Sequence, residues 1–288
     1  MQSKTSVFFK VLINRFHPGI NPVFFKSLPQ DEIKDAFSEV TSSQDTSVAF
    51  SWPVSLILRT HYSWLLPSIQ SLPEDLRNLV ISALPEPHIK GIAKLLKIPA
   101  AKIPLLPYVK TFLLGKLYQI WQPKEALPLE YLPPSPLSDL LVLSKHELVE
   151  LIDLLAMYDL SEAIRHIVGK KHLKALYLCL SPQKQQFLRV CLHKKEKLTA
   201  PKLDIEKWNG SPEQLTTIIH KRGMLRLGKA LSGQNQHFIW NIVHTLDTGR
   251  GNTILEYQQE TQIPGVTPLL VQQVISVINF LKQRAVRE

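Results

Sequence analysis

The chain has 288 residues, of which 44% are hydrophobic, so it can bury one or two sizeable cores and does not belong to the disordered class. Its formal net charge is +10, and no apolar run reaches the roughly 18 residues that a membrane-spanning helix needs. The first residues, MQSKTSVFFKVLINRFHPG, lack a small-residue cleavage pattern, so we expect a first helix there and no signal peptide.

Leu-Pro dipeptides and helix-capping signals mark the first predicted region, residues 1–122. SLPQDEIKDAF begins at Ser27 and SLPEDLRNLV at Ser71, and each reads as a capping box with an acid or amide three residues after the serine. A proline in the first helical turn costs no hydrogen bond. The same signal recurs at Ser144 and Ser211. Apolar residues at three-to-four spacing follow each box, which predicts an all-α protein.

A proline-rich segment, WQPKEALPLEYLPPSPLSD, follows and holds five prolines in nineteen residues. We expect a stiff extended linker over residues 123–136. A basic helical domain is predicted over 137–231, and a C-terminal helical extension over 232–288. The Leu-Pro units do not recur at one fixed period, so we expect an irregular, armadillo-like stack of short helices in two or three domains. Such stacks present an extended surface to other proteins.

The positive charge belongs to one stretch of the chain. Residues 161–230 contain fifteen Lys and Arg against five Asp and Glu, which accounts for the whole net charge of +10. A field of one sign predicts an acidic partner. The candidate contacts are lysines of this stretch: Lys170, Lys171, Lys174, Lys194, Lys195 and Lys197.

Motifs that carry catalytic chemistry are missing from the sequence. It has no glycine-rich phosphate loop, no G-x-S-x-G nucleophile elbow and no H-E-x-x-H zinc motif. Three acids of one predicted helix, Glu147, Glu150 and Asp153, have the spacing of a solvated face. We therefore expect no enzymatic activity, no cofactor and no metal.

The stretch SWPVSLILRTHYSWLLPSIQSLPEDLRNLVISAL, from Ser51, resembles the middle domain of the flagellar motor-switch family FliG. Pro53 matches the proline of that family's docking motif, and the second helix matches its LP-x-x-LR-x-x-V pattern. Trp52 and Val54 stand where the family has His and Gln. The resemblance implies that an exposed helix start at Trp52, Pro53 and Val54 docks the next component of an assembly, through an apolar contact here.

A second stretch, SDLLVLSKHELVELIDLLAMYDLSEAIRH, resembles the C-terminal pattern of the same family, with Asp159, Leu160 and Ala163 in its last element. The segment that follows, GKKHLKALYLCLSPQK, carries basic residues alone where the motor family alternates both signs. A torque surface needs both signs, so the resemblance implies the scaffold without the motor.

The opening RFHPGINPVFFKSLP is similar to that of the SctK family, the accessory proteins of type III secretion sorting platforms. Together these resemblances imply a non-enzymatic bacterial scaffold, cytoplasmic and peripheral at the inner membrane. Its expected partners are an inner-membrane ring protein and sorting-platform components, in a flagellar or an injectisome system. The alternative hypothesis is a basic nucleic-acid-binding helical protein, which needs little more than a cationic patch. Sparse aromatic residues in the basic region, Tyr177, Phe187 and Trp208, make nucleic acid the weaker expectation.

Overall fold

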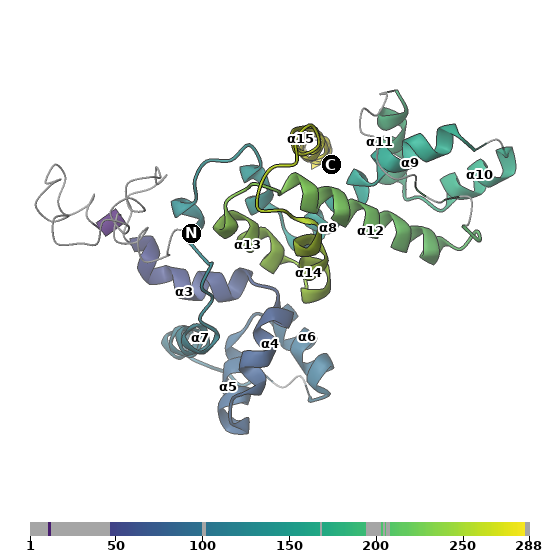
Figure 1. Ribbon diagram of the computed structural model, residues 1–288. Helices are drawn as coiled ribbons and strands as arrows, with labels where there is room; N and C mark the ends of the chain where they lie inside the picture. The colour runs from purple at the N-terminus through teal and green to yellow at the C-terminus, as the bar shows by residue number, and fades with distance from the viewer. Residues whose placement is uncertain are drawn as a thin grey trace, which may run out of the picture. The chain divides into compact units, whose positions relative to one another are not determined.

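The computed structural model describes residues 11–12, 47–99, 102–167, 169–193, 203, 205 and 208–285. Throughout these ranges the regular structure is helical and contains no strand, which confirms the prediction of an all-α protein (Figure 1). No helix in the same ranges has the length and apolar character to cross a membrane. Several sequence predictions lie outside the described residues: the capping box at Ser27, most of the first helix, and Lys194, Lys195 and Lys197.

Contacts along the chain define two compact units, which we describe separately. Unit 1 comprises Met1–Pro134 together with Asn235–Thr248, and unit 2 comprises Ser135–Gln234 together with Gly249–Glu288. The chain therefore leaves unit 1, builds most of unit 2, returns to unit 1 for one helix, and finishes in unit 2. The separate extension expected over 232–288 is not a single body, because its residues are divided between the two units.

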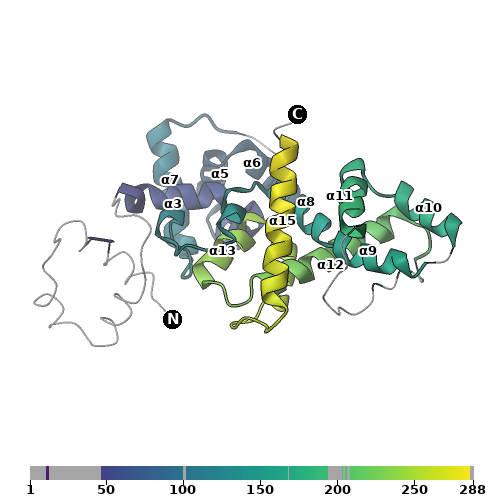
Figure 2. The ribbon, with the colours of Figure 1, turned by 90° about the horizontal axis from the view of Figure 1, so that it is seen from above.

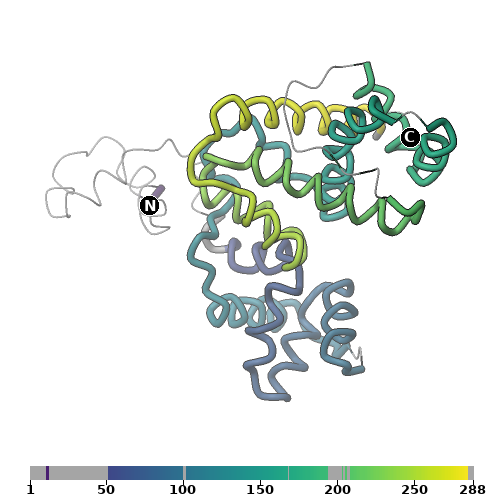
Figure 3. The backbone as a smooth tube through the Cα atoms, turned by 45° about the vertical axis from the view of Figure 1, so that its right-hand side comes forward, coloured from purple at the N-terminus to yellow at the C-terminus, as the bar shows by residue number. Residues whose placement is uncertain are grey.

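Unit 1 is built from short helices, which Figure 3 traces as a tube. Its helices are α3 (Ser47–Arg59), α4 (Tyr62–Gln70), α5 (Glu74–Ala83), α6 (Glu86–Leu96), α7 (Pro107–Trp121) and α13 (Gln236–Thr245). Several of them have a proline at or next to their first residue, as at Pro107. Proline lacks a backbone N–H, but at this position the N–H would have no hydrogen-bond acceptor within the helix, so nothing is lost. Helix α7 packs against both α3 and α5.

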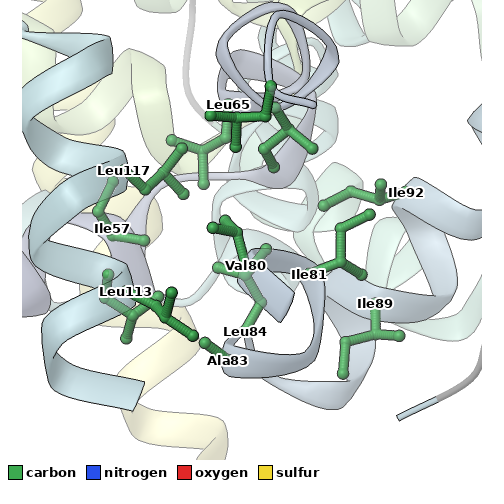
Figure 4. Close-up of a cluster of buried hydrophobic side chains, with 13 residues drawn as sticks. Ile57, Leu65, Val80, Ile81, Ala83, Leu84, Ile89, Ile92, Leu113 and Leu117 are labelled. Atoms are coloured by element: carbon green, nitrogen blue, oxygen red, sulfur yellow. The ribbon is translucent and has the colours of Figure 1, made fainter. Parts of the chain in front are cut away.

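Aliphatic side chains from these helices meet in one core (Figure 4). Ile57, Leu65 and Leu117 are fully buried, and Val80 and Ile92 lie in the same cluster. Burying an aliphatic side chain of this size contributes about 1.5–3 kcal/mol. Each helix has one apolar stripe and none could stay folded alone, so this shared core holds the short helices in place.

Helix α13 is fixed to unit 1 by hydrogen bonds as well as by packing. The amide of His61 donates to the carbonyl oxygen of His244 over 2.8 Å, and Asn241 Nδ2 donates to the carbonyl oxygen of Leu127 over 3.2 Å. Asn241 is buried, so its amide satisfies a backbone oxygen that water does not reach.

The proline-rich segment is packed into unit 1 over much of its length, which corrects the prediction of an extended linker over 123–136. Ala126, Leu127, Tyr131 and Leu132 are buried, and a short 3-10 turn, η2 (Leu129–Tyr131), bends the chain. The division between the units comes after Pro134. The segment packs instead of staying extended because the apolar side chains between its prolines are removed from water when they pack against unit 1.

Unit 2 is organised around one long helix, α12 (Pro212–Ala230), which packs on α8 and is crossed by α15 (Figure 2). A second pair, α9 and α11, packs beside it. The remaining elements are η3 (Ser138–Val142), α8 (Lys145–Leu155), α9 (Met157–Arg165), α10 (Lys170–Leu178), α11 (Pro182–Leu192), α14 (Thr248–Tyr257) and α15 (Thr267–Ala285).

The predicted helix caps have mixed outcomes. Ser144 and Glu147 form a complete capping box at the start of α8, as the spacing predicts. Ser211 accepts from the amide of Gln214 at the start of α12. The box expected at Ser71 is absent, because the N-cap of α5 is Pro73, two residues later, and the Ser71 hydroxyl donates back to the carbonyl oxygen of Ser68. That serine closes α4 instead of opening α5.

Candidate functional site

The exposed basic surface predicted from the sequence is carried, in the described part of the chain, by helix α10. Gly169 precedes the helix in an extended conformation, and Leu176 is its buried anchor. Lys170, Lys171 and Lys174 are exposed, and none of the three has an ion-pair partner among the described residues. The three charges therefore remain available to an external partner.

The second predicted contact, at Trp52, Pro53 and Val54, differs from the prediction. Helix α3 begins at Ser47, so Pro53 lies inside the helix. The Trp52 side chain is only 4% exposed and packs with Leu56, Ala126 and Trp240. Pro53 and Val54 are half-buried. The expectation of an exposed apolar docking point at Trp52 is therefore wrong, because the indole fills the core of unit 1.

A buried carboxylate, Asp153 on α8, organises a cluster of charged groups that the sequence did not predict. Asp153 is 8% exposed, which corrects its assignment to a solvated face. Lys184 of α11 lies 2.7 Å from its Oδ2 oxygen, and Nδ1 of His220 on α12 lies 2.6 Å from its Oδ1 oxygen. Arg250 of α14 donates from Nε to Nε2 of His220 over 2.7 Å. Four helices are thus joined through one imidazole and one carboxylate.

The bonding pattern selects one tautomer of His220. Because Nε2 of His220 accepts from an arginine, Nδ1 carries the proton and donates it to Asp153. Burial by itself raises the pKa of Asp153, but the hydrogen bonds from His220 and Lys184 outweigh it and hold the pKa below its ordinary value. A general base needs a free imidazole nitrogen facing its substrate, and the arginine occupies that nitrogen here.

A second buried carboxylate, Asp159 in the first turn of α9, connects this helix to α12 by hydrogen bonds. Arg226 donates from Nε and Nη2 to the two carboxylate oxygens over 2.7 and 2.8 Å, and Arg222 donates to Oδ2 over 2.8 Å. Arg226 also donates to the amide oxygen of Gln273 on α15. Burial raises the pKa of Asp159, and the two arginines more than reverse that effect, so its pKa is lowered. This network acts as a structural clamp.

A cavity of about 630 Å³ opens next to the Asp153 cluster, between α8, α12 and α14. Its wall combines the paired His220 and Arg250 with the exposed Lys221 and Glu256. The hydroxyls of Thr217 and Thr253 on the same wall donate to backbone carbonyl oxygens of their own helices. In the part of the chain that the structure describes, no group of three His, Cys, Asp or Glu side chains has the arrangement of a metal site. The cavity wall is consequently built mostly from groups that already satisfy one another.

The buried pairs had a sequence signal that composition alone does not reveal. Asp153 and Asp159 sit in the run LVELIDLLAMYDL, where apolar residues surround each acid. A carboxylate inside an apolar run is buried only when a cation meets it. The partners come from HKRGMLR on α12, more than sixty residues away, and for Asp153 also from Lys184 on α11. The sequence analysis placed Asp153 on a solvated face and matched Asp159 only to a family pattern, and it assigned a buried partner to neither.

No family model matches the chain, and no significant match was found among the curated proteins or the solved structures.

Proposed function

We propose that this protein is a non-enzymatic scaffold of a type III secretion, flagellar-related cytoplasmic platform. In this role it links an inner-membrane ring protein to the sorting-platform components and works peripherally at the cytoplasmic face of the inner membrane. Its short helices then act as an armadillo-like stack that displays binding surfaces. The observation that carries the proposal is the exposed, unpaired basic face of α10 at Lys170, Lys171 and Lys174.

The charges inside unit 2 support a scaffold over a catalyst. Asp153 and Asp159 are held by three cationic side chains and one imidazole, and together they join five helices, so these polar groups fix the positions of the helices. The basic face of α10 stands apart from these internal pairs.

The proposed partner surface is an acidic cytoplasmic domain of the ring protein, or the anionic lipid beside it. A single exposed lysine contributes under about 1 kcal/mol in such contacts. Several together raise the encounter rate and give an affinity that falls with salt. Lys194, Lys195 and Lys197 belong to the same proposed surface by sequence.

The test is a triple charge reversal, Lys170→Glu with Lys171→Glu and Lys174→Glu, in the organism of origin. We expect recruitment to isolated inner-membrane complexes to be lost while the helical circular dichroism is unchanged. A matched control reverses three exposed lysines of unit 1, Lys94, Lys102 and Lys124, which alters the net charge by the same amount. Recruitment that survives the α10 reversal, or is lost equally in the control, contradicts the proposal. Recovery of secretion-ring and sorting-platform proteins with the unaltered chain supports it.

Nucleic acid is a second candidate partner, because the basic face of α10 could also bind phosphate groups. Against it, Phe187 and Trp208 are buried, and the Trp208 indole donates to the carbonyl oxygen of Ser211. Tyr177 is half-buried, with Arg189 beside its ring. None of the three presents an open face for base stacking. Tight binding to nonspecific duplex that weakens steeply with salt would favour this candidate.

A further inference from the structure

Helix α7 carries two exposed aromatic side chains in a ridge on the side away from the buried leucines that it gives to the core of unit 1. Tyr108 is 70% exposed and Phe112 is 61% exposed. These two residues, with Gly115 and Gln119, are spaced at i, i+4, i+7 and i+11, so they form one line along the helix. The opposite side is used by the core, where Leu113, Leu114 and Leu117 are buried.

This arrangement differs from the scattered exposed apolar residues of an ordinary surface. Isolated hydrophobic side chains in water need no explanation, whereas a contiguous patch marks an interaction site. Leu106, just before the helix, is also 57% exposed. The spacing along the ridge is that of the seam at which one helix packs on another.

Gly115 adds a second property to the ridge. A Cβ atom built at this position meets no atom within 4 Å, so the glycine is not required by packing inside unit 1. It costs helix stability relative to alanine, because glycine loses more backbone entropy. Between Phe112 and Gln119 it leaves a shallow gap where the side chain of a docked helix can approach the backbone of α7.

The charge on α7 identifies the kind of partner. The helix contains Lys110 and Lys116 and no acidic residue. The Lys116 ammonium lies 5.7 Å from the centre of the Phe112 ring and donates to Gln119, so it stands on the ridge itself. A second copy of this chain packed ridge to ridge would bring like charges together, which is unfavourable. A helix with acidic flanks would pair with Lys116, whereas Lys110, two residues after Tyr108, lies on the other side of α7.

We propose that the α7 ridge, Tyr108, Phe112, Gly115 and Gln119, is a docking site for an amphipathic helix of another protein whose flanks carry carboxylates. Tyr108 and Phe112 are the apolar anchors, and Lys116 sets the charge preference. The inference rests on residues of α7 alone, so it stands whether or not the secretion-platform proposal holds.

The test uses two synthetic helical peptides of three heptads, with identical leucine seams and with either glutamate or lysine on the flanks. We expect fluorescence anisotropy of the full chain with labelled peptide to show binding of the acidic peptide and at least tenfold weaker binding of the basic one. Tyr108→Ser with Phe112→Ser should weaken the acidic peptide at least tenfold, and Lys116→Glu should shift the preference toward the basic peptide. The matched control is Leu178→Ser on α10, where the leucine is also 70% exposed, and it should leave binding unchanged.

Three results would overturn the proposal: no binding, equal binding of both peptides, or binding that survives loss of both aromatic residues. Self-association that Phe112→Ser abolishes, measured by sedimentation equilibrium, would assign the ridge to a second copy and would also overturn it. The aromatic variants should keep the melting temperature of the parent chain, because both side chains lie in solvent. The triple α10 reversal should not change peptide binding, so failure here is distinguishable from failure of the scaffold proposal.

Discussion

Single residues show how far burial changes the chemistry of a side chain in this protein. His244 of α13 is the clearest case, since its ring stacks on Trp240 at a centroid distance of 3.8 Å and lies 4.1 Å from the ring of Trp64. Its Nδ1 donates to the carbonyl oxygen of Trp240. Burial lowers the pKa of His244 to about 4, against the opposing effect of that hydrogen bond. The imidazole is therefore neutral at pH 7.

The low pKa of His244 makes the stability of unit 1 depend on pH. Between about pH 6.5 and about pH 4 the unfolded chain binds a proton that the folded chain does not, so stability falls as the pH falls through this window. The shift corresponds to about 3 kcal/mol. We expect urea unfolding, followed by tryptophan fluorescence, to show that loss between pH 7 and pH 4.

The matched control for this prediction is His244→Phe, which keeps an aromatic ring and removes the titration. Its stability should vary much less over the same window. The buried carboxylates Asp153 and Asp159 have lowered pKa values, so their contributions are lost only in more acidic solution, below the ordinary carboxyl range. An unchanged pH profile in the phenylalanine variant would mean that another group titrates. A flat profile in the parent chain would show that contact with the indoles offsets the cost of burying the charge.

At the level of elements, α12 is the helix on which unit 2 depends. It provides both arginines of the Asp159 clamp and the His220 of the Asp153 cluster. It also crosses α8 at very short range, since a Cβ added at Gly223 would lie 1.8 Å from the carbonyl oxygen of Ile152. Only glycine permits this approach of two backbones.

Two glycine-to-alanine substitutions inside helices should therefore have opposite effects. Gly223→Ala forces α12 and α8 apart, and we expect it to destabilise unit 2 by about 1–3 kcal/mol or more. Gly115→Ala meets open space on α7, and we expect it to stabilise unit 1 by about 0.5–1 kcal/mol. Thermal and urea unfolding of both variants measure the difference. A midpoint for Gly223→Ala that is not lowered would contradict the close crossing, and a lowered midpoint for Gly115→Ala would contradict the open space at that position.

On the scale of the whole molecule, the chain passes between its two units three times, after Pro134, after Gln234 and after Thr248. Two consecutive domains would need one such connection. Unit 1 takes its last helix, α13, from residues that follow most of unit 2. Trp240 of that helix completes the cluster around Trp52 and lies 5.6 Å, centre to centre, from the ring of Trp121. Unit 1 is therefore incomplete until the chain has been made to Thr248.

This topology predicts the behaviour of a chain that ends at Pro134. Without α13, Trp52 loses a packing partner, and the carbonyl oxygens of Glu125 and Leu127 lose their donors. We expect this chain to unfold at a lower urea concentration and with reduced cooperativity, observed as an early red shift of tryptophan fluorescence. A peptide covering Asn235–Thr248 should restore stability in proportion to its concentration. A scrambled peptide should not, and full stability of the short chain without any peptide would contradict the prediction.

Features that depend on neighbours within about one helical turn could be predicted from the amino-acid sequence. The helical class, the capping box at Ser144 and the helix start at Ser211 follow from local spacing. So does the exposure of the lysines of α10, because charged side chains stay in water unless a partner is supplied. Even at this range Ser71 was assigned to the wrong helix, since its hydroxyl could bond in either direction.

The tertiary structure alone decided which side chains are buried and what they meet. Trp52 is covered by Trp240, Asp153 by His220, and the proline-rich segment by the rest of unit 1, and these partners lie far away in the sequence. The spacing of apolar residues predicts that a segment is helical, but it does not predict which other helix packs against it. The division of residues 232–288 between two units has the same cause, since only contacts between distant segments assign a helix to a core.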